Sequence, residues 1–388
     1  MRQVLLAVQG PIQLIAGYIA MAYYESLLDE KSEVEHTLLL YDFLAPKGVE
    51  SEFIDVIKTL SSLHEWKEIV FIDSVKMSEI FNSRYVKTIH KFKNLMGKNK
   101  FDIIYTGRDF LGPGSPLIIN AYPDARRILY GDSLGLVGDE DDHKDNRDLS
   151  IRVVASKVRS FLRSIIYGQA KRYPFDMAVL SLPIDWSGSY LDNIPLLVTS
   201  KKLVTEIFSR FREKLFLKNY SSDFNKNNSK NYLFLFGNLS TAGMLSPDSE
   251  VDLYVEIILN SAAEDSNIYI KGHPRDSKSV VEIVADKLKG KFKNIIYEYG
   301  DLEKYPIELW INYLPSCKVI SIYSTSAINL SYLYGKDIEF PLTNALINKY
   351  FYPHKVDYII KGNIVTKEAT MNLDEWNGVE PLWSAKKK

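Results

Sequence analysis

Two short motifs in the second half of the sequence carry groups that could bind and protonate a phosphate. Residues 271–275 read Lys-Gly-His-Pro-Arg directly after an apolar run, and residues 324–326 read Ser-Thr-Ser between an apolar run and a helical stretch. Hydroxyls and backbone N–H groups at a helix N-terminus favour an anion, because the unpaired donors and the helix dipole point at it. A histidine with basic neighbours can donate to a phosphate and pass it a proton. Together the motifs favour a phosphate site over a turn histidine and an ordinary helix cap.

An acidic residue in the first half offers the complementary chemistry. Asp132 follows the apolar residues 128–130 and lies between Gly131 and Ser133. A carboxylate exposed at the end of a strand could accept a proton from a substrate hydroxyl. The same residue could also be a turn aspartate that binds its own backbone. On its own, Asp132 leaves both interpretations open.

Short apolar strands alternate with helical stretches and must position these groups. Strands are predicted at residues 4–8, 37–41, 68–72, 101–105, 127–130, 232–236, 267–271, 295–297 and 319–322, with a further candidate at 176–181. Helices are predicted at residues 12–28, 51–63, 76–95, 151–170, 248–262, 279–289, 306–314 and from the Ser-Thr-Ser motif to 334. This alternation predicts an α/β fold with parallel sheets, in which ligands bind beyond the carboxyl ends of the strands.

A polar segment divides the chain. Residues 218–230 are almost entirely polar, and such a composition cannot bury a core. We therefore predict an N-terminal domain at 1–217, a linker at 218–230 and a C-terminal domain at 231–388, both domains Rossmann-like with parallel sheets facing a central cleft. The last helices can return to pack on the N-terminal domain.

Composition excludes several classes of protein. The chain has 388 residues, 46% of them hydrophobic and 25% charged, with a net charge of -1, which is ordinary for a folded domain and lacks the basic excess of a nucleic-acid binder. Its single cysteine, Cys317, cannot form an intrachain disulfide. The apolar run at residues 3–8 is too short for a membrane span or a signal peptide, so a cytoplasmic location is expected. Motifs for a P-loop, a nicotinamide fold and an α/β-hydrolase are missing from the sequence.

The set of motifs resembles the signatures of bacterial sialyltransferases with the GT-B fold, a group that includes lipooligosaccharide sialyltransferases and capsule polysialyltransferases. The resemblance rests on Gly131-Asp132-Ser133, on Lys271-Gly272-His273-Pro274 and on Ser324-Thr325-Ser326. The opening Gln9-Gly10-Pro11-Ile12-Gln13 also looks like the first strand–turn–helix of that group. Asp132 stands where the family has the second of two acids, and Ser133 stands where it has glycine.

The resemblance implies an inverting glycosyltransferase that moves sialic acid, or a related nonulosonic acid, from a CMP-activated donor to a glycan hydroxyl. The N-terminal domain would bind the acceptor, a glycan of lipooligosaccharide or capsule type, and the C-terminal domain the donor. Asp132 would deprotonate the acceptor hydroxyl, and His273 would bind and protonate the leaving phosphate. The CMP-sugar would be bound by Lys271, Gly272, Pro274, Gly237, Asn238, Glu308, Ser324, Thr325 and Ser326. The acceptor or the donor sugar would be bound by Gln9, Gly10, Arg108 and Ser133.

No metal or cofactor is expected, because a monophosphate leaving group carries less charge than a diphosphate and a histidine can replace a divalent ion. Alternatives are the transfer of another CMP- or CDP-linked group (Kdo, pseudaminic or legionaminic acid, or glycerol phosphate), a non-catalytic nucleotide-sugar-binding protein, and an epimerase acting on a UDP-sugar. Oligomerisation stays open, as does peripheral association of Lys386-Lys387-Lys388 with the inner face of the plasma membrane. No nucleic-acid partner is expected.

Overall fold

The computed structural model describes most of the chain. The described residues are 1–28, 33–41, 50–81, 85–107, 114–131, 175–183, 194–215, 230–273, 278–322, 324–371 and 373. Contacts within the chain divide it into two units: residues 1–44 and 61–204 belong to the first, and residues 45–60 and 205–376 to the second. The predicted linker at 218–230 lies outside the described residues except for Lys230, so the predicted domain boundaries stay predictions.

The first unit is built on a parallel sheet. Its described strands pair in the order β3-β2-β1-β4-β5-β6-β7, every neighbouring pair being parallel. Their bounds are β1 (Arg2–Val8), β2 (Val34–Tyr41), β3 (Glu68–Ile72), β4 (Ile103–Thr106), β5 (Arg126–Gly131), β6 (Met177–Leu180) and β7 (Leu196–Val198). The last five residues of β1 are fully buried. A strand covered on both faces needs a continuous apolar run, which is why the sequence marks these strands so clearly.

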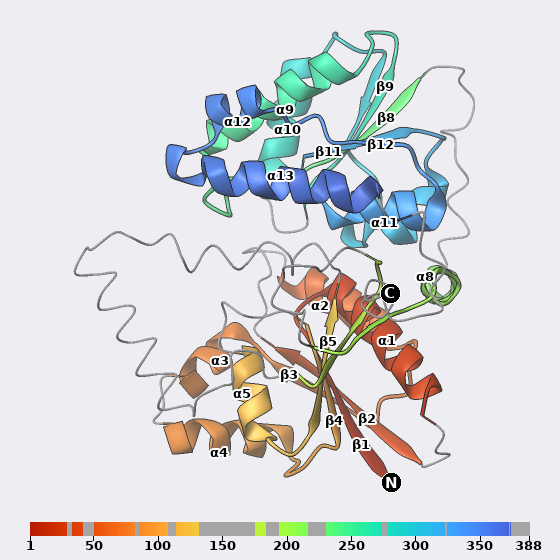
Figure 1. Cartoon of the computed structure of the whole chain (residues 1–388). Coiled ribbons are helices and arrows are strands. Elements are labelled where there is room, and N and C mark those ends of the chain that lie inside the picture. Colours follow the sequence, from red (N-terminus) through yellow and green to blue (C-terminus); the bar gives the residue numbers. More distant parts are fainter. Residues whose placement is uncertain are drawn as a thin grey trace, which may run out of the picture. The chain divides into compact units, whose positions relative to one another are not determined.

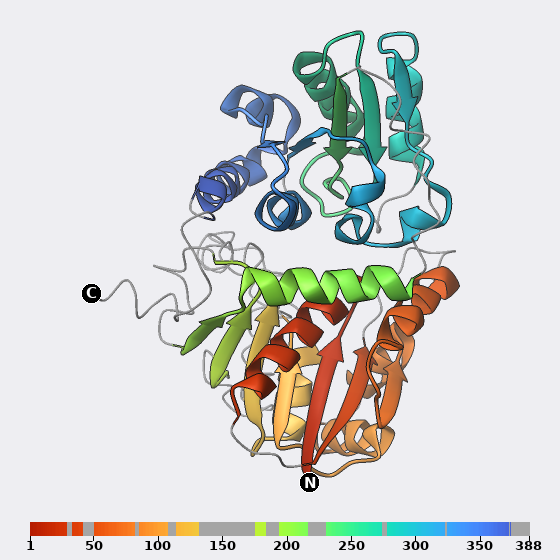
Figure 2. The ribbon, with the colours of Figure 1, turned by 90° about the vertical axis from the view of Figure 1, so that its right-hand side faces the viewer.

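Helices cover both faces of this sheet. The described helices that belong wholly to this unit are α1 (Pro11–Ser26), α3 (Ser74–Phe81), α4 (Tyr85–Met96) and α5 (Gly114–Ala121), whereas α2 (Glu50–Ser61) belongs to the second unit except for its last residue. Figure 1 shows α3, α4 and α5 on one face, where their apolar residues form a core with alternate residues of the central strands. Helix α1 lies along β1, β4 and β5 on the other face (Figure 2). The close packing of α1 on β1 and β5 depends on Gly17, because a Cβ at that position would lie 2.6 Å from Leu6 Cδ1 and 3.0 Å from Tyr130 Cζ.

The second unit repeats the pattern with a smaller sheet. Its described strands pair in the parallel order β10-β9-β8-β11-β12. Their bounds are β8 (Asn231–Leu235), β9 (Asn267–Lys271), β10 (Asn294–Ile296), β11 (Lys318–Ser321) and β12 (Ile338–Glu339). The helices are α9 (Pro247–Ser261), α10 (Lys278–Leu288), α11 (Thr325–Tyr334), α12 (Asn344–Tyr350) and α13 (Val356–Met371), with 3-10 turns η4 (Gly300–Lys304), η5 (Ile307–Leu309), η6 (Ile311–Tyr313) and η7 (Pro353–Lys355). Helix α8 (Lys201–Lys214) begins in the first unit and ends in the second.

The predicted α/β class with parallel sheets is confirmed, and the predicted strands are present with small shifts at their ends. Two helix predictions are wrong. Residues 76–95 form parts of two helices, α3 and α4, and residues 306–314 form the 3-10 turns η5 and η6. The helix predicted at 151–170 lies outside the described residues. Among the helices that the structure describes, none has both the length and the apolar composition that a membrane span requires.

An asparagine ladder fixes the register at the amino edge of the second sheet. Asn267 donates its side-chain amide to Asn231 Oδ1 at 2.9 Å and accepts from Asn294 Nδ2 at 2.7 Å. These asparagines begin β8, β9 and β10 and occupy one row of the sheet. A slip of one residue would break both bonds and turn the apolar side chains to the wrong face. The ladder therefore helps to specify which residues end each strand.

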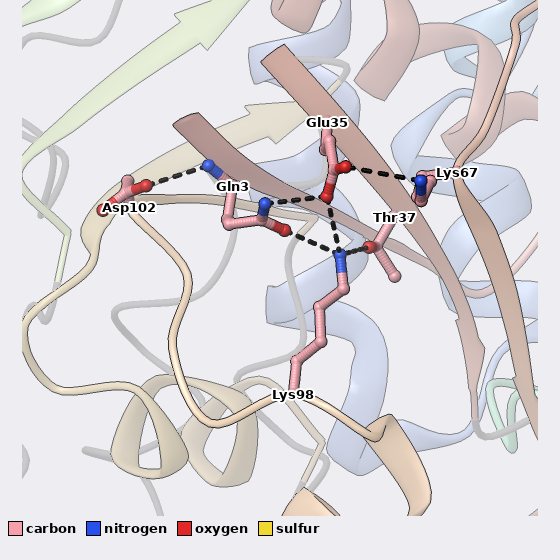
Figure 3. Close-up of polar contacts among 6 residues, drawn as sticks. All are labelled: Gln3, Glu35, Thr37, Lys67, Lys98 and Asp102. Atoms are coloured by element: carbon pink, nitrogen blue, oxygen red, sulfur yellow. Dashed lines mark hydrogen bonds and ion pairs between the residues drawn. The ribbon is translucent and has the colours of Figure 1, made fainter. Parts of the chain in front are cut away.

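A mixed polar network performs a similar role at the amino edge of the first sheet (Figure 3). Lys98 Nζ donates to Gln3 Oε1 at 2.7 Å and to Thr37 Oγ1 at 3.0 Å, and it lies 4.0 Å from Glu35 Oε2. Gln3 in turn donates its amide to Glu35 at 2.8 Å and its backbone N–H to Asp102 at 2.8 Å. One lysine thus joins β1 and β2 at the amino edge of the sheet.

Replacement of Lys98 by methionine tests this role. We expect Lys98→Met to lower the free energy of unfolding by about 1–2 kcal/mol, because it leaves half-buried acceptors without their donor. Lys100→Met is the matched control: Lys100 pairs with Asp102 but its side chain is 73% exposed, so a loss below about 0.5 kcal/mol is expected. Urea denaturation measures both. Equal losses in the two variants would contradict the assigned role.

Candidate functional site

Three strands of the second sheet end in a single row. Leu235 of β8 pairs with Lys271 of β9 on one side and with Ser321 of β11 on the other. The loops that follow these strands therefore start at the same level of the carboxyl edge. These loops carry Gly237 and Asn238 after β8, Gly272 and His273 after β9, and Ser324, Thr325 and Ser326 after β11. The sheet therefore brings the predicted donor-binding segments to one edge. The strand order reverses between β8 and β11, and ligands of parallel α/β sheets bind at such a point.

Lys271 is a buried lysine at the end of β9. Its side chain is only 9% exposed, and Nζ donates to the backbone carbonyls of Gly272 at 3.2 Å and Glu303 at 3.0 Å. Burial lowers the pKa of Lys271 to about 8, although the carboxylates of Glu303 and Glu308 favour the charged form. The ammonium group thus joins the end of β9 to η4. Its predicted contact with a phosphate stays a prediction.

Gly272 lets the chain pass close to α10 before His273. A Cβ at position 272 would lie 2.9 Å from Val281 Cγ2, closer than real side chains approach. His273 follows this close contact directly and is partly buried at the carboxyl edge of the sheet. Pro274 lies outside the described residues. The glycine of the motif is therefore required for packing, and it sets the position from which the histidine starts.

Side chains of α9 bind the backbone of the loop that follows β8. The Glu250 carboxylate accepts from the backbone N–H of Leu239 at 2.9 Å and of Ser240 at 3.0 Å, and also from the Ser240 hydroxyl. Tyr254 Oη accepts from the N–H of Gly237 at 2.6 Å, and its ring stacks on Phe236 with centroids 3.7 Å apart. These contacts fix the backbone that presents Gly237 and Asn238.

The Ser-Thr-Ser motif forms the start of α11. Ser324 is the N-cap residue, with an extended backbone, and its side chain makes no capping hydrogen bond. Thr325 and Ser326 occupy the first two helical positions, and all three residues are partly buried. The alternative interpretation, an ordinary side-chain cap, therefore has the right position but lacks the bond that defines it. In this first turn the N–H of Ala327 donates to Ser324 O at 3.2 Å, while the N–H groups of Thr325 and Ser326 stand at the helix start, where backbone donors can bind an anion.

Glu308 lies fully buried next to the same motif. It belongs to η5, and its Oε1 accepts from Asn329 Nδ2 at 2.9 Å. Asn329 is on α11, four residues after Thr325, so both residues lie on one face of that helix. The charge of Glu308 also acts on Lys271. The structure therefore brings Glu308 together with β9 and α11, and its predicted contact with the donor stays a prediction.

The first unit offers a similar edge, of which only part is described. Gln9 follows β1, and its N–H donates to Gln13 Oε1 at 2.8 Å, while Gly10 is the N-cap residue of α1 with an extended backbone. Strands β1 and β4 lie at the point where the strand order reverses, the expected place for a ligand. The remaining predicted residues, Arg108, Asp132 and Ser133, lie outside the described residues.

Sequence reasoning missed two groups that shape the site, Glu250 and Asn329. Glu250 interrupts an apolar stripe of α9 that includes Leu253, Tyr254 and Ile257. A charged residue on a buried helical face must have partners, so this interruption was a usable signal. Asn329 gives a similar signal within the apolar residues of α11.

The first prediction for this site concerns Gly272. We expect Gly272→Ala to lower the free energy of unfolding by about 1–3 kcal/mol, because the new methyl group overlaps with Val281. Gly237→Ala is the matched control, since its nearest atoms lie 3.7 Å away. In Gly272→Ala/Val281→Ala the combined loss should be smaller than the sum of the single losses. Urea denaturation that gave additive losses would rule out the overlap.

The second prediction concerns the protonation of Lys271. Between about pH 8 and about pH 10 the unfolded lysine keeps its proton while the folded one loses it, so its contribution to stability becomes more favourable as pH rises. Relative to Lys271→Met, the wild-type free energy of unfolding should therefore rise by up to about 1.4 kcal/mol per pH unit in this range.

Urea titrations at a series of pH values measure this difference. Lys289→Met, at an exposed position, serves as the control and should show a difference from wild type that does not change with pH. A pH-independent difference for Lys271→Met would contradict the lowered pKa.

Comparison with solved structures places the fold. The UDP-GlcNAc 2-epimerase from Neisseria meningitidis bound to UDP-GlcNAc is 12% identical with a TM-score of 0.50, and the match covers 98% of this chain and 95% of that one. The S. aureus MnaA–UDP complex is 12% identical with a TM-score of 0.49, covering 100% and 94%. The wall teichoic acid polymerase TagF is 10% identical with a TM-score of 0.41, covering 99% and 82%. At these identities the likeness concerns the fold alone, which is GT-B-like.

Comparison with protein families identifies the sequence relationship. Residues 148–339 match the model of the alpha-2,8-polysialyltransferase family. This segment includes Lys271, His273, Glu308 and the Ser-Thr-Ser motif, and it begins after Asp132. The search of curated protein sequences found no match. Residues 148–339, just under half of the chain, are similar to the alpha-2,8-polysialyltransferase family, and this match together with the GT-B-like α/β fold supports a glycosyltransferase.

Proposed function

We propose that this glycosyltransferase moves a nonulosonic acid, such as sialic acid, from a CMP-activated donor to a glycan hydroxyl with inversion at the anomeric carbon. The second unit would bind the donor. The observation that carries the proposal is the common carboxyl edge of β8, β9 and β11, where His273 and the first turn of α11 start from one row of the sheet. The family match spans both segments.

The proposed reaction needs one base and one acid. The acceptor oxygen attacks the anomeric carbon, Asp132 takes the proton of that hydroxyl, and the bond from the anomeric carbon to the phosphate oxygen breaks. CMP leaves with the bonding electrons, and His273 donates a proton to its phosphate. The hydroxyls and N–H groups of Ser324, Thr325 and Ser326 would hold the same phosphate.

Glu308 is the proposed contact for the ribose of the cytidine. It is fully buried, and Asn329 holds one of its oxygens. Asn329 lies one helical turn beyond Thr325 on α11, and this proximity to the proposed phosphate contacts supports Glu308 as the ribose contact. Gly237 and Asn238 would line the nucleotide site, and Lys271 would add positive charge beneath the phosphate.

We further propose that the reaction needs no metal ion. Within the residues that the structure describes, no group of three or more His, Cys, Asp or Glu side chains could hold one. The proposed phosphate contacts are instead a histidine, hydroxyls and backbone N–H groups. Activity that persists in excess chelator is the expected result, and strict dependence on an added divalent cation would contradict this part of the proposal.

The family match implies a nucleotide-sugar donor and a glycan acceptor. The family description names alpha-2,8-polysialyl transfer, so an oligosialic acid is the first acceptor to test, followed by lipooligosaccharide and capsule-type glycans. The reaction is proposed to occur in the cytoplasm, where CMP-activated sugars would be available.

The decisive experiment incubates the purified chain with a panel of CMP-nonulosonates and measures CMP release with and without acceptor. We expect His273→Gln and Asp132→Asn each to lower kcat by about 100-fold or more, because each removes one proton transfer. His273→Gln should also weaken CMP binding, whereas Asp132→Asn should leave it unchanged.

Exposed residues of the same types provide the controls. His90→Gln and Asp124→Asn, both at exposed positions of the first unit, should keep wild-type turnover. Thermal shifts with CMP, CDP and UDP test the nucleotide independently. Stabilisation by UDP but not by CMP would contradict the proposal, as would full turnover by either catalytic-site variant.

A further inference from the structure

Residues 299–314 carry Glu308 on an irregular stretch of backbone. The stretch contains η4, η5 and η6, and short 3-10 turns have poor hydrogen-bond geometry of their own. Side chains from β9 and from the stretch itself bind its carbonyls. Lys271 donates to Glu303 O at 3.0 Å, and Trp310 Nε1 donates back to Tyr305 O at 3.1 Å. The position of Glu308 thus depends on contacts that come from outside η5.

Arg212 of α8 supplies the contacts at Glu308 and the next residue. Its Nε donates to Leu309 O at 3.1 Å. Its Nη2 donates to Tyr334 Oη at 3.2 Å, and the Tyr334 hydroxyl donates onward to Glu308 O at 2.9 Å. The guanidinium group also lies over the Tyr334 ring, 5.8 Å from its centroid. A single side chain thus holds two consecutive carbonyls, one directly and one through tyrosine.

The carboxylate of Glu308 is held independently by α11. Asn329 donates to its Oε1, and the same helix supplies Tyr334. Glu308 is therefore fixed at its backbone by Arg212 and Tyr334 and at its side chain by Asn329. Because α11 begins with the Ser-Thr-Ser motif, the network also ties the position of Glu308 to the proposed phosphate contacts.

Arg212 lies on a helix, α8, that is anchored by a buried apolar face. Its buried residues Val204, Ile207, Phe208 and Phe211 form one apolar stripe. Arg212 follows Phe211 directly, and the chain passes from the first unit to the second between Val204 and Thr205, inside the same helix. Arg212 therefore joins this helix to the backbone of Glu308 and Leu309.

We propose that Arg212 is a positioning residue for donor binding, which places Glu308 against the ribose of the nucleotide through Leu309 O and the Tyr334 hydroxyl. This inference rests on the proposed function, because it assigns Glu308 to the nucleotide. Arg212 itself contacts neither the substrate nor the reacting atoms. Loss of its donors would raise the KM for the donor more than it would lower kcat.

The test measures CMP binding by calorimetry and donor kinetics in the full chain. Arg212→Met should weaken CMP binding and raise the donor KM by about tenfold, the cost of losing hydrogen bonds from a charged donor. Tyr334→Phe removes one hydroxyl and should give a smaller change in the same direction. Arg210→Met, on an exposed position of the same helix, should stay within about twofold of wild type.

A double variant separates positioning from general stability. If Arg212 acts through Glu308, Arg212→Met should have little further effect on CMP binding in a Glu308→Gln background. Additive effects would overturn the inference, as would wild-type CMP affinity in both Arg212→Met and Tyr334→Phe. If Arg212→Met does not fold, CMP binding is measured instead in a double-mutant cycle of Tyr334→Phe and Glu308→Gln. Additive effects on CMP affinity in this cycle would likewise overturn the inference. If wild type binds no CMP, the proposed function fails instead.

Discussion

The site depends on the parallel pairing of Leu235 with both Lys271 and Ser321. This row makes three strands end together, so short loops are enough to bring His273, the start of α11 and the Gly237–Asn238 segment to one edge. At the opposite edge, Asn231, Asn267 and Asn294 form a ladder that joins β8, β9 and β10, and Asn231 also donates to Ser316 O at 3.1 Å, just before β11. Hydrogen bonds at the amino ends of the strands therefore help to set the register, and the register determines which residues lie at the carboxyl ends.

Buried charges hold the loops in the second unit. Lys271, Glu250 and Glu308 are each nine-tenths or more buried, and each binds backbone or side-chain groups of a neighbouring element. Burying a charge is costly unless hydrogen bonds compensate for the lost water. These contacts are directional, unlike apolar packing, so they restrain the loops to one backbone conformation. The arrangement is compatible with the proposed function, in which a histidine and a helix start contact the same phosphate.

Much of the fold follows from the sequence, because strands buried on both faces need continuous apolar runs such as residues 4–8. The placement of His273 and the Ser-Thr-Ser motif also follows, since both come directly after such runs. The 3-10 turns at 307–313 do not follow, because donors from distant elements, including Arg212, decide their backbone. Local sequence likewise names no partner for Glu250 or Asn329. The predicted base Asp132 lies beyond the described end of β5.

In both units the polar networks that join the strands lie at the opposite end of the strands from the candidate ligand contacts. The Lys98 network and the asparagine ladder lie at the amino edges, whereas the candidate ligand contacts lie at the carboxyl edges. The amino edges are accordingly the places to attach a surface tether, or to engineer heat resistance, with the least disturbance of turnover. A chain immobilised there keeps the carboxyl edges of both sheets free of the support.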